Sequence, residues 1–363
     1  MTAPLRTLQI GKSWLPEVGA NGLDRMFYGL GQHLPPLGVE VSGLVAGTPD
    51  VDRQSSWAQS FAPTSAPLVR RLLRARQCGQ ALFEEKPIDL IACHFALYGL
   101  PLWDRLARTP TVIHFHGPWA AESAAEGESS VTIRGKKLLE RCTYWAGQRF
   151  IVLSEAFRKV LVTSYGVSPD RIRIVPGGVD ADAFDVDGSP TDARNRLGWP
   201  TDRPIILSVR RLARRMGLSN LIEAMETISR RHPDVLLLIA GKGPIREELE
   251  AQIQAKELED HIQLLGFVPD EDLPYAYRAA DVSVVPTVQH EGFGLITIES
   301  LAAGTPVLVT PVGGLPETVR DLDDRLVLPA SSPEALQEGL GGALNGRLPL
   351  PDADTCQRWA RST

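Results

Sequence analysis

Apolar runs typical of buried strands alternate with amphipathic stretches along nearly the whole chain, and this alternation constrains the fold more than any other feature. The first set of strand-like runs lies at residues 5–11, 39–45, 88–95, 111–115, 149–153 and 171–175. A second set lies at residues 204–209, 235–240, 262–266, 281–285, 306–310 and 325–328. Stretches with helical spacing lie between strands, notably at 23–34, 68–83, 136–146 and 155–165.

Alternating strands and helices favour parallel sheets that helices cover on both faces. A Gly- and Asp-rich stretch at 177–200 separates the two sets, so two domains are expected, 1–185 and 186–363. The length of 363 residues agrees with two domains of roughly 180 residues each. We therefore predict two Rossmann-like domains that face a cleft.

The composition is ordinary for a globular protein, with 43% hydrophobic and 23% charged residues. No apolar run approaches the ~20 residues needed to span a bilayer. The chain begins with a strand-like run, unlike a signal peptide, so the cytoplasm is the expected compartment. The four cysteines are scattered without a CxxC pair, which indicates neither a disulfide framework nor a zinc site.

The net charge of −6 is unevenly distributed. Residues 1–183 contain 20 Lys and Arg against 17 Asp and Glu, whereas the remainder contains 18 against 27. This split suggests an anionic partner for the first half but is far too weak to indicate nucleic acid. Residues 68–76 combine apolar and cationic faces, which suggests peripheral contact with the inner face of an anionic membrane. The alternative is a surface helix that packs on its own sheet.

The stretch 290–299 carries the clearest functional signal. Two acids, Glu291 and Glu299, are eight positions apart, and Gly292-Phe293-Gly294-Leu295 lies between them. A predicted strand precedes this stretch, and a helix is expected to start at Leu295. Backbone N–H groups at such a strand-to-helix turn attract phosphate, while Glu291 and Glu299 suit sugar and ribose hydroxyls. The spacing fits a nucleotide-sugar.

This stretch resembles the family-4 retaining glycosyltransferases (glycosyl transferases group 1), whose signature is two glutamates separated by seven residues. The likeness continues through residues 300–307 and 313–317, and earlier through 208–212, 239–244, 114–117 and 174–180. It implies the GT-B fold, an α/β architecture of two doubly wound parallel-sheet domains. Related enzymes usually continue past the point that corresponds to Thr363, so the natural chain is expected to be longer or its domains less firmly held.

The resemblance implies a hexosyltransferase that moves a hexose from a nucleoside diphosphate sugar to a sugar or lipid-linked acceptor with retention of configuration. Cell-surface polysaccharide or glycolipid synthesis is the expected setting. The implied mechanism is a front-face attack in which the departing phosphate takes the acceptor's proton. No metal and no cofactor are expected. The first domain would bind the acceptor and the second the donor.

The resemblance also implies roles for individual residues. Those expected to take part in catalysis are Glu291, His116 and Arg211. Those expected to bind the donor are Gly22, Arg211, Arg215, Glu291, Gly292, Phe293, Gly294, Leu295 and Glu299. The family places a Lys near this Arg, but here the position holds Met216 or, shifted by one, Arg215. Each basic side chain could instead belong to a solvated loop, and Gly22 to an ordinary tight turn.

Metal-binding patterns are weak in this sequence. His114 and His116 alternate along a strand and face the same side, but no third ligand has suggestive spacing. Aspartate triplets at 180–182, 185–187 and 352–354 resemble the DxD motif of another glycosyltransferase fold, yet they follow no suitable strand. A structural role is expected for His114, whereas the resemblance implies that His116 contacts the donor sugar, as the matching histidine does in related enzymes.

Two other functions are compatible with the pattern. A non-hydrolysing nucleotide-sugar epimerase uses the same fold and would form product without an acceptor. A non-catalytic sugar-nucleotide-binding subunit is less favoured, because both motif glutamates are present.

Overall fold

A computed structural model describes residues 4–15 and 22–362. The chain forms two compact units. Unit 1 comprises Met1–Ala124 and Glu128–Val175, and unit 2 comprises Ala125–Gly127 and Pro176–Thr363. The change of unit at Val175 lies ten residues before the boundary expected at residue 185.

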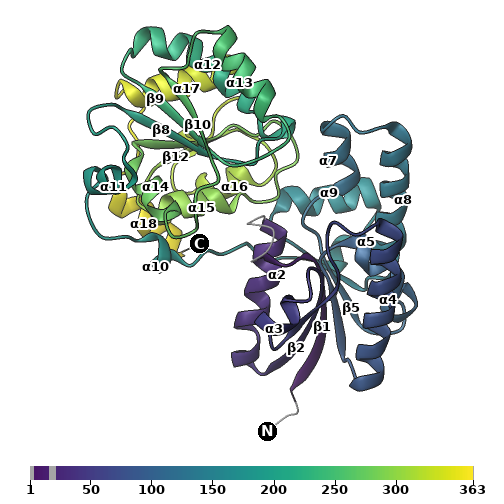
Figure 1. The fold of residues 1–363 in the computed structure, drawn as a ribbon. Helices are drawn as coiled ribbons and strands as arrows, with labels where there is room; N and C mark the ends of the chain where they lie inside the picture. Colours follow the sequence, from purple (N-terminus) through teal and green to yellow (C-terminus); the bar gives the residue numbers. More distant parts are fainter. Residues whose placement is uncertain (1–3, 16–21, 363) are drawn as a thin grey trace. The chain divides into compact units, whose positions relative to one another are not determined.

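Unit 1 is built on a seven-stranded sheet in the order β3-β2-β1-β4-β5-β6-β7, with every pair parallel. Its strands are β1 (Leu5–Ser13), β2 (Val39–Ala46), β3 (Ala58–Ala62), β4 (Leu90–Cys93), β5 (Thr111–His114), β6 (Arg149–Val152) and β7 (Ile172–Ile174). The longer helices are α2 (Gly22–His33), α4 (Leu68–Glu85), α8 (Ser130–Ala146) and α9 (Glu155–Tyr165). In Figure 1, α2 and α3 (Val51–Gln54) lie on one side of this sheet, and α4 and α5 (Ala96–Gly99) lie on the other.

Unit 2 is built on a five-stranded parallel sheet in the order β10-β9-β8-β11-β12. The strands are β8 (Ile205–Val209), β9 (Leu236–Ala240), β10 (Ile262–Gly266), β11 (Val282–Val285) and β12 (Val307–Val309). The helices are α10 (Ala181–Phe184), α11 (Pro190–Leu197), α12 (Leu218–Arg231), α13 (Arg246–Ala255), α14 (Leu273–Ala279), α15 (Leu295–Ala302), α16 (Leu315–Val319), α17 (Pro333–Leu344) and α18 (Ala353–Ser362).

The central strands are apolar because both faces of each sheet are covered. Leu8 and Ile10 of β1 are fully buried, as are Ile205 to Leu207 of β8. Parallel strands buried on both faces read as continuous apolar runs, which is the pattern that the sequence showed. The prediction of two α/β parallel-sheet domains is confirmed.

The observed strands differ from the predicted ones in two places. The short strand β3 was not expected, because its sequence AQSFA contains the polar Gln59 and Ser60 and lies at the edge of the sheet. The strand predicted at 325–328 is wrong: the region contains a 3₁₀ turn, Asp324–Leu326, and a single bridge between Val309 and Val327.

Each sheet has a point where the strand order reverses. In unit 1 this point lies between β1 and β4, and in unit 2 it lies between β8 and β11. The connections from such neighbouring strands lead away in opposite directions, which opens a crevice at the carboxyl ends where open α/β sheets bind ligands.

Candidate active site

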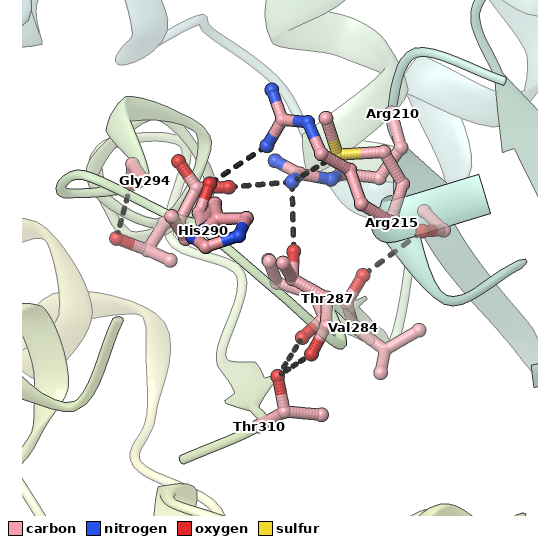
Figure 2. Close-up of polar contacts among 12 residues, drawn as sticks. Arg210, Arg215, Val284, Thr287, His290, Gly294 and Thr310 are labelled. Atoms are coloured by element: carbon pink, nitrogen blue, oxygen red, sulfur yellow. Dashed lines mark hydrogen bonds and ion pairs between the residues drawn. The ribbon is translucent and has the colours of Figure 1, made fainter. Parts of the chain in front are cut away.

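A buried ion pair lies at the reversal point of unit 2. Arg210 follows β8, and Glu291 lies in the loop between β11 and α15. Nη2 of Arg210 is 2.5 Å from Oε2 of Glu291 and also donates to the Thr287 hydroxyl over 2.7 Å. The side chains are only 8% and 16% exposed. Figure 2 shows Arg210 meeting the loop that carries Thr287. The pair therefore places two fixed charges at the carboxyl ends of the central strands β8 and β11.

Side-chain hydrogen bonds hold β8, β11 and the loop after β11 in register. The Ser208 hydroxyl donates to the Val284 carbonyl over 3.0 Å, and the Thr310 hydroxyl donates to the Thr287 carbonyl over 2.6 Å. Figure 2 shows Val284, Thr287 and Thr310 in this arrangement. A Cβ on Gly313 would collide with the Glu291 carbonyl, so glycine permits the close approach of these backbones.

The loop before α15 has an unusual backbone. His290 has a φ of +53°, which is uncommon for a residue other than glycine. Its carbonyl accepts a hydrogen bond of 2.7 Å from Nη1 of Arg215. Gly294 has a φ of +86° and stands directly before the first residue of α15. The first N–H groups of a helix lack intrahelical acceptors, so this end of α15 suits an anion.

Glu299 lies inside α15 and is almost fully buried. Its Oε2 accepts a hydrogen bond of 3.0 Å from the Tyr277 hydroxyl. Tyr277, on α14, had not been singled out in the sequence, because the contact joins residues 22 positions apart. The structure thus separates the two glutamates: Glu291 pairs with a cation, whereas Glu299 is held by a neutral hydroxyl.

The basic residues differ from one another in their surroundings. Arg211, the expected catalytic arginine, has an exposed side chain without a polar partner among the residues described. The buried cation is its neighbour Arg210, which sequence reasoning missed. Nη2 of Arg210 also lies 2.7 Å from Sδ of Met216, the residue at the expected lysine position. The guanidinium of Arg210 therefore lies beside Met216, the position where the family pattern has a lysine.

Three histidines meet in unit 1, at the ends of β4 and β5. Nδ1 of His94 is 3.2 Å from Nε2 of His116, and the rings of His94 and His114 stack at 4.3 Å. No third ligand had suggestive spacing in the sequence, but pairing of β4 with β5 brings His94 beside His116, 22 positions away. Ring nitrogens of the three lie within 4.8 Å of one another, a geometry that could hold a metal ion.

Burial keeps these imidazoles neutral. It lowers the pKa of His114 to about 4, and burial together with the nearby His114 lowers the pKa of His116 to about 3. The pKa of His94 falls well below its ordinary value, mainly through burial and secondarily through the other two rings. At neutral pH the cluster therefore carries no charge.

The other predicted positions have simpler surroundings. Gly22 is the exposed first residue of α2, and a Cβ there would meet open space, whereas Gly19 to Asn21 fall outside the described part of the chain. Two of the aspartate triplets contribute partners for Arg361, which pairs with Asp182 and, at 2.8 Å, with Asp185. These acids therefore have a structural use.

Comparison with known proteins supports one family for both units. Residues 20–183 match the family described as Glycosyltransferase Family 4, and residues 190–362 match Glycosyl transferases group 1. The D-inositol 3-phosphate glycosyltransferase of Acidothermus cellulolyticus is 30% identical over 328 residues, which cover 86% of this chain and 70% of that protein. Three of the curated relatives are matched over 53%, 70% and 80% of their own lengths.

Solved structures show the same fold. Sucrose-phosphate synthase from Thermosynechococcus elongatus aligns with a TM-score of 0.81 and 24% identity, covering 99% of this chain and 94% of that one. Anabaena HepE in complex with UDP and glucose aligns with a TM-score of 0.78 and 19% identity, covering 99% and 95%.

Fold and sequence together define a glycosyltransferase of the GT-B architecture. The chain belongs to the family-4 glycosyltransferases, the glycosyl transferases group 1. The comparisons do not support the alternative of an epimerase. No helix within residues 4–15 and 22–362 is long and apolar enough to cross a membrane.

Proposed function

We propose that the protein transfers a hexose from a nucleoside diphosphate sugar to a sugar or lipid-linked acceptor, with retention of configuration and without a metal ion. The observation that carries this proposal is the buried Arg210–Glu291 pair directly before the N-terminus of α15. Fixed dipoles and charges at this point suit a diphosphate and a sugar. Anabaena HepE, a protein of similar fold, has been solved with UDP and glucose.

Roles for the residues follow from their surroundings. Glu291 accepts from sugar hydroxyls, and Arg210 orients that carboxylate. The exposed Arg211 and the amides from Gly292 to Leu295 bind the diphosphate. Arg215 acts by holding the His290 carbonyl, which fixes the loop in front of α15. Glu299 accepts from ribose, His116 contacts the donor sugar, and the N-terminus of α2 at Gly22 approaches phosphate or acceptor.

In the proposed reaction, the bond from the anomeric carbon to the phosphate oxygen breaks and its electron pair leaves with the phosphate. The acceptor hydroxyl attacks from the same face, and its proton passes to the departing phosphate oxygen. The protein contributes positioning and positive charge as the leaving group develops. Arginines and helix N–H groups supply that charge, so the step needs no divalent ion.

The test is a screen of the common nucleotide sugars with sugar and lipid-linked acceptors, in the presence and absence of EDTA. The expected result is acceptor-dependent release of nucleoside diphosphate that EDTA leaves unchanged, with the donor's anomeric configuration kept in the product. An inverted product contradicts retention, and loss of activity with EDTA contradicts metal independence.

The acceptor proposal includes peripheral contact with an anionic membrane during glycolipid or polysaccharide synthesis. Residues 68–76 form the start of α4, where Leu68, Val69 and Leu73 are exposed. Three of the four arginines in this stretch have partners in unit 1 itself. Arg71 donates to the Tyr98 hydroxyl, Arg74 to Gln77 on the same helix, and Arg76 pairs with Asp104.

A second exposed stripe of side chains, on α8, supports the proposed membrane contact. Residues at helical spacing alternate apolar and cationic along it: Val131, Arg134, Leu138, Arg141 and Trp145. Val131 and Trp145 are 76% and 75% exposed, and Trp145 stacks on Trp103. Exposed tryptophan beside arginine and leucine is typical of a helix that lies in a membrane interface.

Sedimentation with phosphatidylglycerol vesicles at low salt tests the contact. The wild type is expected to bind, and the double variant Leu138→Gln, Trp145→Gln to bind less. The control is Leu37→Gln, since Leu37 is also highly exposed. Absence of wild-type binding, or equal binding to pure phosphatidylcholine vesicles, contradicts the proposal.

A further inference from the structure

A continuous series of hydrogen bonds runs from the His116 ring into the sheet of unit 1. Nε2 of His116 meets Nδ1 of His94 at 3.2 Å, and Nε2 of His94 meets Oε1 of Gln9 at 2.8 Å. The Gln9 amide nitrogen donates to the Thr7 hydroxyl over 3.3 Å, and that hydroxyl donates to the Glu40 carbonyl over 3.3 Å. Thr7, Gln9 and His94 are all buried.

The far end of this series determines its direction. A backbone carbonyl only accepts, so the Thr7 hydroxyl donates to Glu40 and uses a lone pair for the Gln9 amide nitrogen. The carbonyl oxygen of Gln9 must then face His94, which requires a proton on Nε2 of that ring. A neutral imidazole carries one proton, so Nδ1 of His94 accepts and Nε2 of His116 donates.

We propose that Thr7 and Gln9 lock His94 and His116 in the Nε2–H tautomer, so that Nδ1 of His116 is a hydrogen-bond acceptor for a hydroxyl of the donor sugar. The tautomers follow from the hydrogen bonds within unit 1, whereas the contact with the sugar rests on the proposed function. Thr7, Gln9 and His94 are positioning residues that act through His116.

The hydrogen-bond series also bears on metal binding. A metal ion held between Nδ1 of His94 and Nε2 of His116 would need the lone pairs of both atoms, but the first accepts a proton and the second carries one. Burial of the rings disfavours the imidazolium form, which has no free lone pair, so the neutral series persists through the neutral pH range. His114 stacks on His94, and its Nδ1 has no hydrogen-bond partner among the residues described.

Nitrogen-15 NMR of histidine-labelled full-length protein tests the tautomers directly. The chain has seven histidines, so signals can be assigned by single substitutions. In the wild type at neutral pH, His94 and His116 are expected to show a protonated Nε2 and an unprotonated Nδ1, without exchange between tautomers. A protonated Nδ1 on His116, or a stoichiometric metal ion whose removal alters these signals, overturns the proposal.

Variants of the two positioning residues test the cause of the lock. In Gln9→Leu, His94 loses its acceptor, and in Thr7→Val the Gln9 amide is free to reverse, so each is expected to give both tautomers. Thr7→Val removes the contact with the Gln9 amide, which lies one step away from the histidines. It therefore keeps the test valid if Gln9→Leu does not fold. Thr143→Val is the matched control, because Thr143 is another buried threonine of unit 1 that donates to a carbonyl, that of Ala96.

The signals of His94 and His116 are expected to stay unchanged in Thr143→Val. A single unaltered tautomer in both Gln9→Leu and Thr7→Val, or an equal change in Thr143→Val, overturns the lock.

Donor kinetics test the contact with the sugar. If Gln9→Leu populates the two tautomers about equally, only about half of the protein carries the Nδ1 acceptor on His116, so the donor KM is expected to rise about twofold with little change in kcat. An unchanged donor KM alongside mixed tautomers overturns the role of the Nδ1 acceptor. Absence of glycosyl transfer in the wild type would instead refute the proposed function, while the tautomer result would stand.

Discussion

The two units place different polar chemistry at the same topological position. At the reversal point of unit 1, neutral side chains from β1 and from the ends of β4 and β5 form a hydrogen-bonded series. At the reversal point of unit 2, a residue after β8 and a residue after β11 form an ion pair. One fold therefore supports both a neutral and a charged site, because the residues after the strands, and not the sheet, determine the chemistry.

The two clusters are expected to respond differently to perturbation. Removing one partner of a buried ion pair leaves an uncompensated charge, which is strongly destabilising. A neutral series of hydrogen bonds loses far less stability when one hydrogen bond is removed. It is sensitive to acid, however, because protons compete for the lone pairs of its imidazoles. Unit 2 should therefore be the more sensitive to charge deletion and unit 1 the more sensitive to pH.

The largest effect is expected for Arg210→Ala. This change removes the cation that pairs with the mostly buried carboxylate of Glu291. Unit 2 should therefore lose about 3–5 kcal/mol of stability, and the enzyme should lose most of its turnover. Thermal unfolding and donor turnover provide the measurements.

Arg211→Ala is the control, because the neighbouring side chain is exposed. It should change stability by less than about 0.5 kcal/mol while weakening binding of the diphosphate. Equal loss of stability in Arg210→Ala and Arg211→Ala would remove the distinction between the buried and the exposed arginine.

Acid is expected to destabilise unit 1. The folded-state pKa values of His94, His114 and His116 lie below the unfolded value near 6.5, so their contribution is full above pH 6.5 and is lost as the pH falls toward 4. Glu140 opposes this trend, because burial raises its pKa to about 7. Near pH 5, where the histidines of the unfolded chain are protonated, three protons taken up on unfolding against one released give a net loss of stability of a few kcal/mol per pH unit, with a smaller slope near pH 6.5.

Amide hydrogen exchange at pH 6.5 and pH 5, corrected for intrinsic rates, can follow this loss in each unit. Protection should fall in β4 and β5 more than in β8 and β11. Unit 2 is not wholly insensitive, since burial also lowers the pKa of His290. An equal fall in both units would contradict the assignment of acid sensitivity to the histidine cluster.

A smaller effect is expected for Glu299→Gln. The substitution keeps an oxygen for the Tyr277 hydroxyl but weakens acceptance from ribose, so donor affinity should fall about tenfold while turnover at saturation changes little. Calorimetric titration with nucleoside diphosphate measures the affinity. Undiminished affinity would remove the ribose role.

Much of the fold could be predicted from the sequence, because buried parallel strands are continuous apolar runs. Eleven of the twelve strand-like runs coincide with strands. β3 was missed because its short edge sequence lacks such a run, and 325–328 was overestimated because an apolar run can also accompany a turn. Strand prediction therefore depends on an uninterrupted apolar run, which a real strand can lack and a turn can contain.

The site was predictable where its residues are contiguous. The loop from His290 to Gly294 lies between β11 and α15, and Glu299 lies within α15, as expected. Arg210, His94 and Gln9 were missed because their partners are 81, 22 and 85 positions away or are reached only through strand pairing. The adjacent Arg210 and Arg211 could not be distinguished, since only the three-dimensional packing shows which side chain is buried.

The central claim is that the charged site of unit 2 carries the transfer reaction, and turnover of Glu291→Gln tests it most directly. The glutamine can still accept a hydrogen bond from Arg210, but the charge that orients the reacting sugar is lost. The buried guanidinium also loses its counter-charge, so a lower melting temperature is expected alongside the loss of turnover. At saturating donor and acceptor, kcat should fall by roughly 10²–10³, the range seen when one such electrostatic contact is removed. A kcat within twofold of the wild type, in a variant shown to be folded, would contradict the account.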